Sequence, residues 1–268
     1  MIPARPSSFL KWYFGGHVER RVLRSFAALE MRGLARVREA AATGPILFVS
    51  NHTAWWDPML CILLSTRLVP LDGYAMMDAR NLRTLPFLGR LGGFGVELDD
   101  AGDRSAGVDY STGLLNGPGR AVWIFCQGRE RPVTERPLEF KPGAAVVANR
   151  APQATVLPVA LRYCFRHLEK PYFLVSIGEP VASSDEVETT RLGQERAVEI
   201  ELERIEQFLR RPGPEHGFET VLRRRRSWAG RTLERALGLL TGGARSAARP
   251  LRSLPRHERE SSSTRDGG

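Results

Sequence analysis

Two side chains that together could form a catalytic base stand five positions apart. His52 and Asp57 lie within residues 46–58, which read ILFVSNHTAWWDP. An imidazole oriented by a carboxylate works as a general base at neutral pH, and such a base contributes roughly 10² to 10⁴ to a rate. The alternative is that His52 is a loop histidine satisfied by local hydrogen bonds and that Asp57 only caps a helix. The two interpretations differ in whether the imidazole and the carboxylate meet.

The residues around this pair predict a strand, a loop and a helix. Residues 46–49 are an apolar run typical of a buried strand, and Asp57 followed by Pro58 is a good helix start. Five residues of an ideal helix rotate by about 500°, which would leave His52 and Asp57 on different faces. We therefore expect His52 on a loop that folds Asp57 back onto the imidazole.

Three further blocks follow the His-Asp segment in order. They are residues 92–97 (GGFGVE), 122–128 (VWIFCQG) and 155–160 (TVLPVA). Together with Asn51-His52-x4-Asp57 they resemble the N-H-x4-D motif and later blocks of the glycerolipid acyltransferases, the 1-acylglycerol-3-phosphate acyltransferase family. The resemblance spans roughly residues 30 to 180.

The resemblance implies a reaction. His52 would take a proton from an acceptor hydroxyl, which then attacks an acyl thioester, while Asp57 orients the ring and stabilises the imidazolium. The donor would be acyl-CoA or acyl carrier protein, and the acceptor a lysophospholipid of phospholipid biosynthesis. No metal or other cofactor is expected. Two alternatives stay open: another acceptor, such as a lyso-aminolipid or glycolipid, or a degenerate lipid-binding paralogue without activity.

The blocks credited in the family with holding the acceptor's phosphate depart from the family pattern. Leu98 stands where the second block usually has Arg, and the third block, usually Phe-Pro-Glu-Gly-Thr-Arg, reads Phe-Cys-Gln-Gly-Arg-Glu. The substrate-binding residues expected here are Gln127, Gly128, Arg129 and Arg131. Either Arg129 and Arg131 hold the phosphate, helped by Arg83 or Arg90, or the acceptor is not a simple phosphomonoester.

Other residues have competing interpretations. By resemblance, Pro158 shapes the acyl pocket, though it could simply bound an edge strand. Trp55 and Trp56 either line that pocket or pack structurally. Cys126 is a rival nucleophile in a basic loop, or a buried, inert thiol. The sequence has no G-x-S-x-G elbow, and no residue cluster that indicates a metal or nucleotide site.

Alternating apolar and helical segments predict an α/β fold, by resemblance a glycerol-3-phosphate acyltransferase-like layered fold with a central, mostly parallel or mixed sheet flanked by helices. Expected strands are 26–34 (an edge strand and turn), 46–49, 68–77, 92–96, 121–125, 155–163 and 172–177. Expected helices begin at Asp57 and cover 80–91, 103–116, 140–149, 189–210 and, with a basic pattern, 218–240.

The net charge of +9 and the pI near 10.2 indicate an anionic partner. Residues 212–268 hold twelve arginines, no lysine and six acidic residues, a net charge of +6. The arginine run at 223–226 beside Trp228 favours an anionic membrane surface over nucleic acid, which we do not expect to be a partner.

We expect three parts: an interfacial amphipathic helix, or a core-packed helix, in residues 1–24; an acyltransferase domain in 25–211; and a basic, then disordered tail in 212–268. No apolar run reaches the roughly 18 to 20 residues of a membrane span, and three scattered cysteines suggest no disulfide framework. The expected location is the cytoplasmic side of the cell membrane, as a peripheral protein.

Overall fold

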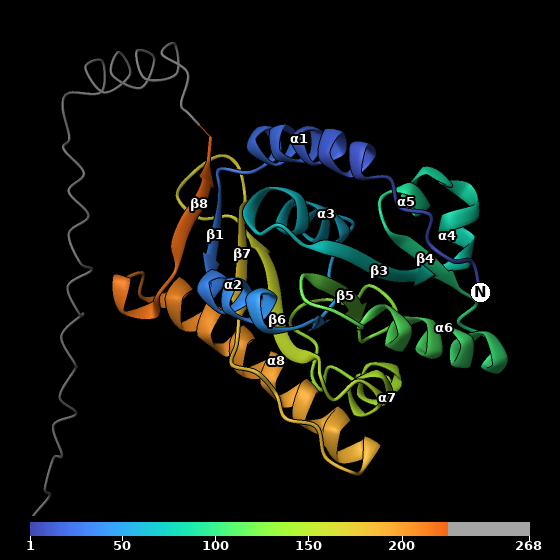
Figure 1. Cartoon of the computed structure of the whole chain (residues 1–268). Coiled ribbons are helices and arrows are strands. Elements are labelled where there is room, and N and C mark those ends of the chain that lie inside the picture. The colour runs from blue at the N-terminus through green and yellow to red at the C-terminus, as the bar shows by residue number, and fades with distance from the viewer. Residues whose placement is uncertain (225–268) are drawn as a thin grey trace, which may run out of the picture. The chain divides into compact units, whose positions relative to one another are not determined.

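A mixed sheet forms the centre of the computed structural model, which describes residues 1–224 (Figure 1). Among these residues the sheet has eight strands in the order β4-β3-β5-β2-β6-β7-β1-β8. Strands β4, β3, β5, β2 and β6 are parallel, β7 runs antiparallel to β6, β1 is parallel to β7, and β8 is antiparallel to β1. The predicted α/β fold with a central mixed sheet is confirmed. The strand bounds are β1 Ala28–Arg32, β2 Ile46–Ser50, β3 Asp72–Asp78, β4 Gly93–Val96, β5 Arg120–Phe125, β6 Thr155–Cys164, β7 Tyr172–Ile177 and β8 Glu219–Arg223.

Helices cover both faces of the sheet, and each face buries its own apolar cluster. Successive side chains of a strand point to opposite faces, so Val49 of β2 packs with α8 while its neighbour Phe48 packs with α1 and α3. A central strand covered on both sides is therefore apolar throughout, as residues 46–49 are. The helix bounds are α1 Ser8–Ser25, α2 Leu34–Thr43, α3 Asp57–Leu63 with a π-helical extension η1 Leu64–Leu68, α4 Ala79–Thr84, α5 Phe87–Arg90, α6 Ala101–Leu114, α7 Gly143–Arg150, α8 Val187–Arg210 and the 3₁₀ turn η2 Pro214–His216.

Helix α3 begins at the predicted place, with Asp57 and Pro58 in its first turn. The carboxylate of Asp57 does not cap this helix. It accepts hydrogen bonds from the backbone N–H groups of Thr53 and Ala54, which precede the helix. The loop after β2 is thus folded back over the start of α3, as the spacing of His52 and Asp57 required.

Two predictions at the far edge of the sheet are wrong. The strand in residues 26–34 is not an edge strand, because β1 lies between β7 and β8. The helix expected from residue 218 is the strand β8 at its start, since Glu219–Arg223 pairs with β1. Residues 225–240 of that expected helix, Trp228 and the tail expected to be disordered lie outside the described residues.

The predicted domain boundaries shift as a result. Residues Met1–Arg224 form one compact unit, so the sheet continues past the boundary expected at 211/212. Helix α1 packs on this unit through buried Val18 and Val22, which matches the core-packed alternative for residues 1–24. The single helix expected at 80–91 is instead two short helices, α4 and α5, interrupted near Pro86.

Candidate functional site

His52 and Asp57 meet at the carboxyl end of β2. The Nδ1 atom of His52 lies 2.7 Å from Oδ2 of Asp57. The Asp57 side chain is fully buried, whereas 19% of the His52 side chain is exposed. A carboxylate at Nδ1 fixes the tautomer with the proton on that nitrogen, so Nε2 carries the lone pair that can accept a proton. The arrangement is that of an oriented general base at the surface of the site.

Asp57 is held by donors on both carboxylate oxygens. Oδ2 also accepts from the N–H groups of Thr53, at 2.7 Å, and Ala54, at 3.0 Å. Oδ1 accepts from the hydroxyl of Tyr163, at 2.5 Å. Burial, followed by the negative charge of Asp57, raises the pKa of Tyr163 well above 10, so the phenol remains a donor at neutral pH. Four donors in all, the imidazole included, keep the buried carboxylate in one orientation.

Tyr163 belongs to this site, although nothing in its sequence surroundings predicts it. It lies in β6, which pairs with β2, and the hydroxyl spans a sequence separation of 106 residues. Asn51 was quoted only as part of the motif, and its role is also structural here. Its amide accepts from the N–H of Leu161 and donates to the carbonyl of the same residue, which fastens the end of β2 to β6. A sequence offers no local signal for either contact.

The His52 backbone and ring are fixed by β5 and the loop that follows it. The ring stacks on Phe125 with centroids 4.6 Å apart. The His52 N–H donates to Oε1 of Gln127, at 2.7 Å, and the His52 carbonyl accepts from the N–H of Arg131. Gln127 is buried and also donates to the carbonyl of Leu138. The predicted substrate-binding residue Gln127 therefore supports the backbone of the base.

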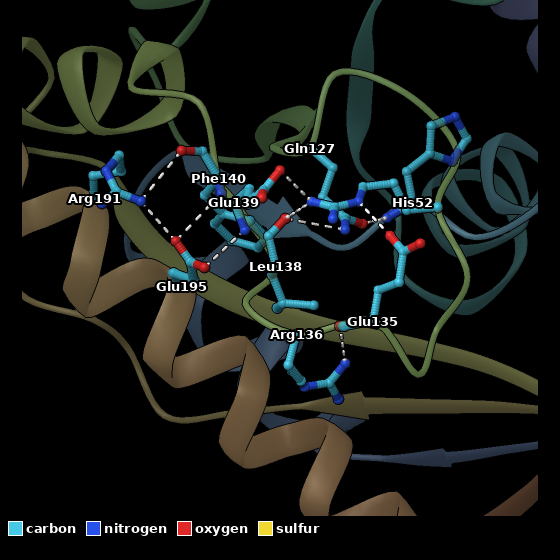
Figure 2. A network of polar contacts seen from close by, with 10 residues as sticks. His52, Gln127, Glu135, Arg136, Leu138, Glu139, Phe140, Arg191 and Glu195 are labelled. Carbon is cyan, nitrogen blue, oxygen red and sulfur yellow. Dashed lines mark hydrogen bonds and ion pairs between the residues drawn. The ribbon is translucent and has the colours of Figure 1, made fainter.

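Arg131 is engaged inside its own loop. Its guanidinium pairs with Glu135 and Glu139, each at 2.8 Å, and donates to the Leu138 carbonyl. Figure 2 shows that the polar contacts of this loop extend to α8, where Glu195 accepts from the N–H groups of Glu139 and Phe140. Two carboxylates neutralise the charge of Arg131, and its contacts stabilise the loop beside His52.

The other predicted binding residues lie in different surroundings. Gly128 has a φ of 71°, a conformation in which a side chain is strained, so glycine suits the turn after β5. Arg129 is exposed and forms no ion pair with any residue from 1 to 224. Pro158 is buried in β6, opposite Val49, on the face covered by α8. The possibility that Pro158 bounds an edge strand is wrong, because β6 lies between β2 and β7.

Cys126 is the buried, inert thiol of the two alternatives. It is 2% exposed, and burial raises its pKa to about 12. A thiol with such a pKa carries almost no thiolate at neutral pH and is a poor nucleophile.

The second-block region has an acidic character. Asp78 at the end of β3 pairs with Arg80, and Glu97 after β4 pairs with Arg83. Asp99 and Asp100 follow directly and are exposed. Arg83, considered above as a phosphate ligand, is therefore neutralised.

Comparison with known proteins identifies the family. The family model described as Acyltransferase matches residues 29–162, which contain the His-Asp loop and the strands β1 to β5, with most of β6. The chain belongs to the Acyltransferase family. A comparison with curated proteins gave no significant match.

An apolar groove lies beside His52 and Asp57, and its walls include Thr53, Ala54 and Tyr163, which donate to Asp57. It encloses about 430 Å³ and is open to solvent. Its walls come from the His-Asp loop, the end of α1 and the segment after β6; they are Ser25, Phe26, Thr53, Ala54, Trp56, Val133, Tyr163, Cys164, Phe165 and Pro171. Trp56 thus lines this groove, while Trp55 is 55% exposed.

Neither a metal nor a membrane span is indicated by the part of the chain that the structure covers. Within residues 1–224, His, Cys, Asp and Glu form no group of three or more that could hold a metal ion. No described helix is long and apolar enough to cross a bilayer.

Proposed function

We propose that the protein transfers a fatty acyl chain from acyl-CoA or acyl carrier protein to the hydroxyl of an anionic lysophospholipid. The observation that carries the proposal is the buried Asp57 held against Nδ1 of the partly exposed His52, beside an apolar groove. Family membership supports acyl transfer to a lipid in general. The lysophospholipid acceptor and the place in phospholipid biosynthesis are our inference.

The reaction needs one base and no covalent enzyme intermediate. Nε2 of His52 removes the proton of the acceptor hydroxyl as its oxygen attacks the thioester carbonyl carbon. The carbon–sulfur bond of the resulting tetrahedral intermediate then breaks. The imidazolium, stabilised by Asp57 meanwhile, returns the proton to the departing thiolate. The products are an ester and a free thiol, and the base is regenerated without a metal or cofactor.

The groove supports a lipid substrate. Its lining is largely aromatic and aliphatic, with Phe26, Trp56 and Phe165 presenting apolar surface. It also contains Thr53 and Tyr163, which touch the Asp57 carboxylate. An acyl chain in this groove would bring the head of an amphiphile to the catalytic pair.

We also propose peripheral attachment to an anionic membrane through α1. Phe9, Trp12 and Tyr13 are 68%, 60% and 56% exposed, and Leu85 and Phe87 are exposed as well. Phe87 lies against Phe14 of α1, with ring centroids 5.7 Å apart, so these apolar side chains share one region of the surface. Exposed aromatic rings of this kind favour the interfacial region of a bilayer.

An acceptor panel tests the proposed reaction. Purified protein, labelled acyl-CoA and acyl carrier protein thioesters would be offered lysophospholipids, a lyso-aminolipid and a lyso-glycolipid, and products measured by mass spectrometry. We expect the highest kcat/KM with a phosphate-bearing lyso-lipid. A preference for the lyso-aminolipid or the lyso-glycolipid would contradict a lysophospholipid acceptor and favour the alternative acceptor. Transfer to none of the acceptors would favour a lipid-binding paralogue without activity.

A further inference from the structure

Four basic side chains line a hollow on the C-terminal half of α1. His17, Arg20, Arg21 and Arg24, with Ser25, enclose about 230 Å³. Residues three and four apart on a helix lie on the same face, so positions 17, 20, 21 and 24 form one basic stripe. All four side chains are exposed.

The positive charge of this stripe is not neutralised within residues 1–224. Arg20, Arg21 and Arg24 form no ion pair there, although Glu19 lies on the same helix. Glu19 is instead 3.7 Å from the guanidinium of Arg67. Three uncompensated guanidiniums within two helical turns attract an anion, and their planar donors suit phosphate oxygens.

The basic hollow adjoins the catalytic loop. The Arg21 guanidinium lies 5.4 Å from the ring centroid of Trp55 and 5.7 Å from that of Trp56, the two residues directly before Asp57. Ser25 lines both the hollow and the apolar groove that reaches Thr53 and Tyr163. One surface therefore passes from arginines to an apolar groove bordered by the residues that hold Asp57.

Two of the four arginines expected to recognise phosphate are already paired: Arg131 with two glutamates, and Arg83 with Glu97. The other two, Arg129 and Arg90, are exposed and form no ion pair within residues 1–224, but neither lines the apolar groove. By contrast, the α1 arginines combine unmatched charge with an adjoining apolar groove. This combination is complementary to an anionic amphiphile.

We propose that Arg20, Arg21 and Arg24 bind the phosphate group of a substrate whose apolar chain occupies the neighbouring groove. The inference rests on the proposed acyl transfer and assigns its phosphate site. The same chemistry is carried by a lysophospholipid acceptor and by the phosphates of acyl-CoA, and kinetics with separately varied substrates distinguishes them.

The test uses the double variant Arg20→Gln/Arg24→Gln in the full chain. Glutamine keeps the helix propensity and removes two charges. The matched control is Arg210→Gln/Arg211→Gln, because these arginines are also exposed, form no ion pair within residues 1–224, and lie at the end of α8 on the other face of the sheet. Short-chain substrates below their aggregation concentration, without vesicles, exclude effects of membrane binding.

The acceptors are a short-chain lysophosphatidate and the matching monoacylglycerol; the donors are acyl-CoA and an acyl-pantetheine thioester lacking phosphate. Loss of two charge-assisted contacts should raise the KM of one phosphate-bearing substrate about tenfold or more over the control variant, and leave its phosphate-free counterpart unchanged. A rise for lysophosphatidate assigns the site to the acceptor, and a rise for acyl-CoA assigns it to the donor. Equal KM values in the two double variants would overturn the site.

A binding measurement separates this inference from the proposed reaction. Titration calorimetry with short-chain lysophosphatidate and with CoA needs no turnover. If the wild type is inactive on every acceptor but binds one of these ligands at least tenfold more tightly than the Arg20/Arg24 variant, the reaction fails and the phosphate site stands. Binding that is equal in wild type, variant and control would remove the site regardless of activity.

Discussion

The ends of β2 and β4 lie at the same edge of the parallel part of the sheet, yet they differ in kind. After β2, four donors hold the Asp57 carboxylate in one orientation against His52. After β4, Glu97 takes up Arg83, and Asp99 and Asp100 add negative charge. The His-Asp pair proposed as the base therefore lies at one strand end, while the other strand end is a poor place for a phosphate. The account accordingly places the base and the phosphate site in different parts of the structure.

The largest effect is expected at the β2 end, from Asp57→Ala. Without the carboxylate, His52 loses its fixed tautomer and the stabilisation of its imidazolium, so kcat should fall by roughly 10³ to 10⁴. Steady-state kinetics with thermal melting checks this. The variant also leaves the hydroxyl of Tyr163 and two N–H groups, all part-buried, without their acceptor, which costs up to about 1–3 kcal/mol for each group that water does not reach. Asp57→Asn is the control with the smaller effect on the fold, because it removes the charge and keeps the size of the side chain. Near-normal turnover in a folded Asp57→Ala protein would exclude the His-Asp mechanism.

A smaller loss is expected from Tyr163→Phe, which removes one of the four donors to Asp57. We expect a fall in kcat of roughly tenfold, about the worth of one hydrogen bond to a charged group. Because the pKa of Tyr163 is raised well above 10, the phenol stays protonated, so the ratio of wild-type to variant rates should be constant from about pH 7 to pH 9.5. A ratio that changes over this range would show that Tyr163 titrates and is more than a fixed donor.

Arg129 and Arg131 follow β5, a strand that lies between β4 and β2 in the sheet. Arg131→Gln should lower the Tm and kcat, since it breaks the brace to Glu135, Glu139 and the Leu138 carbonyl. Arg129→Gln should leave the Tm unchanged, because the side chain is exposed and unpaired within residues 1–224. A strong rise of acceptor KM in the Arg129/Arg131 double variant at unchanged Tm would return phosphate recognition to this loop.

The smallest effect on turnover is expected from removing residues 225–268. These residues hold ten arginines and four acidic residues, a net charge of +6. At about 1 kcal/mol for each basic residue near an anionic surface, their loss should weaken sedimentation with anionic vesicles at low salt. Activity on detergent-dispersed substrate should stay within about threefold, because β8 ends before the cut. Unchanged vesicle binding would exclude a membrane role for the tail, and tighter binding to nucleic acid than to vesicles would assign its charge elsewhere.

The parts of the fold that sequence predicted are those with strong local signals. The apolar run at 46–49 and the Asp57-Pro58 helix start both appear in the structure. The strand β8 could not be recognised from its own residues, because Glu219–Arg223 is short and partly exposed and its strand conformation comes from pairing with β1. Helix α2, whose Val37 and Ala40 are buried against the core, was not predicted.

Tertiary contact also decided the shape of α1. Gly15 and Gly16 have a low intrinsic helix propensity, yet α1 is unbroken from Ser8 to Ser25. A Cβ at Gly15 would lie 2.2 Å from Oγ1 of Thr66, and one at Gly16 would lie 2.5 Å from the guanidinium of Arg67. The glycines therefore permit close packing of α1 on η1, which repays their lower propensity.

In the candidate site, too, some residues have a local sequence signal and others depend on tertiary contacts. His52 and Asp57 were found from their spacing, because they stand five positions apart where one loop leads into helix α3. The contact of Tyr163 with Asp57 joins residues 106 positions apart in the sequence. The pairing of Arg131 with Glu139 depends on how the loop between them folds. The charge of an arginine is visible in a sequence, but whether a carboxylate has already neutralised it is decided by the fold.

The most direct test of the central claim is single-turnover transfer from labelled acyl-CoA by wild type and His52→Ala. The control is His216→Ala, which lies in η2, outside the His-Asp loop, the apolar groove and the basic hollow. The imidazole of His52 is partly exposed and stacks on Phe125, so thermal melting of His52→Ala checks that the fold survives. The account predicts that wild type and His216→Ala form labelled ester, and that folded His52→Ala forms it at least about 10²-fold more slowly. Transfer by His52→Ala within a few-fold of wild type would contradict the account.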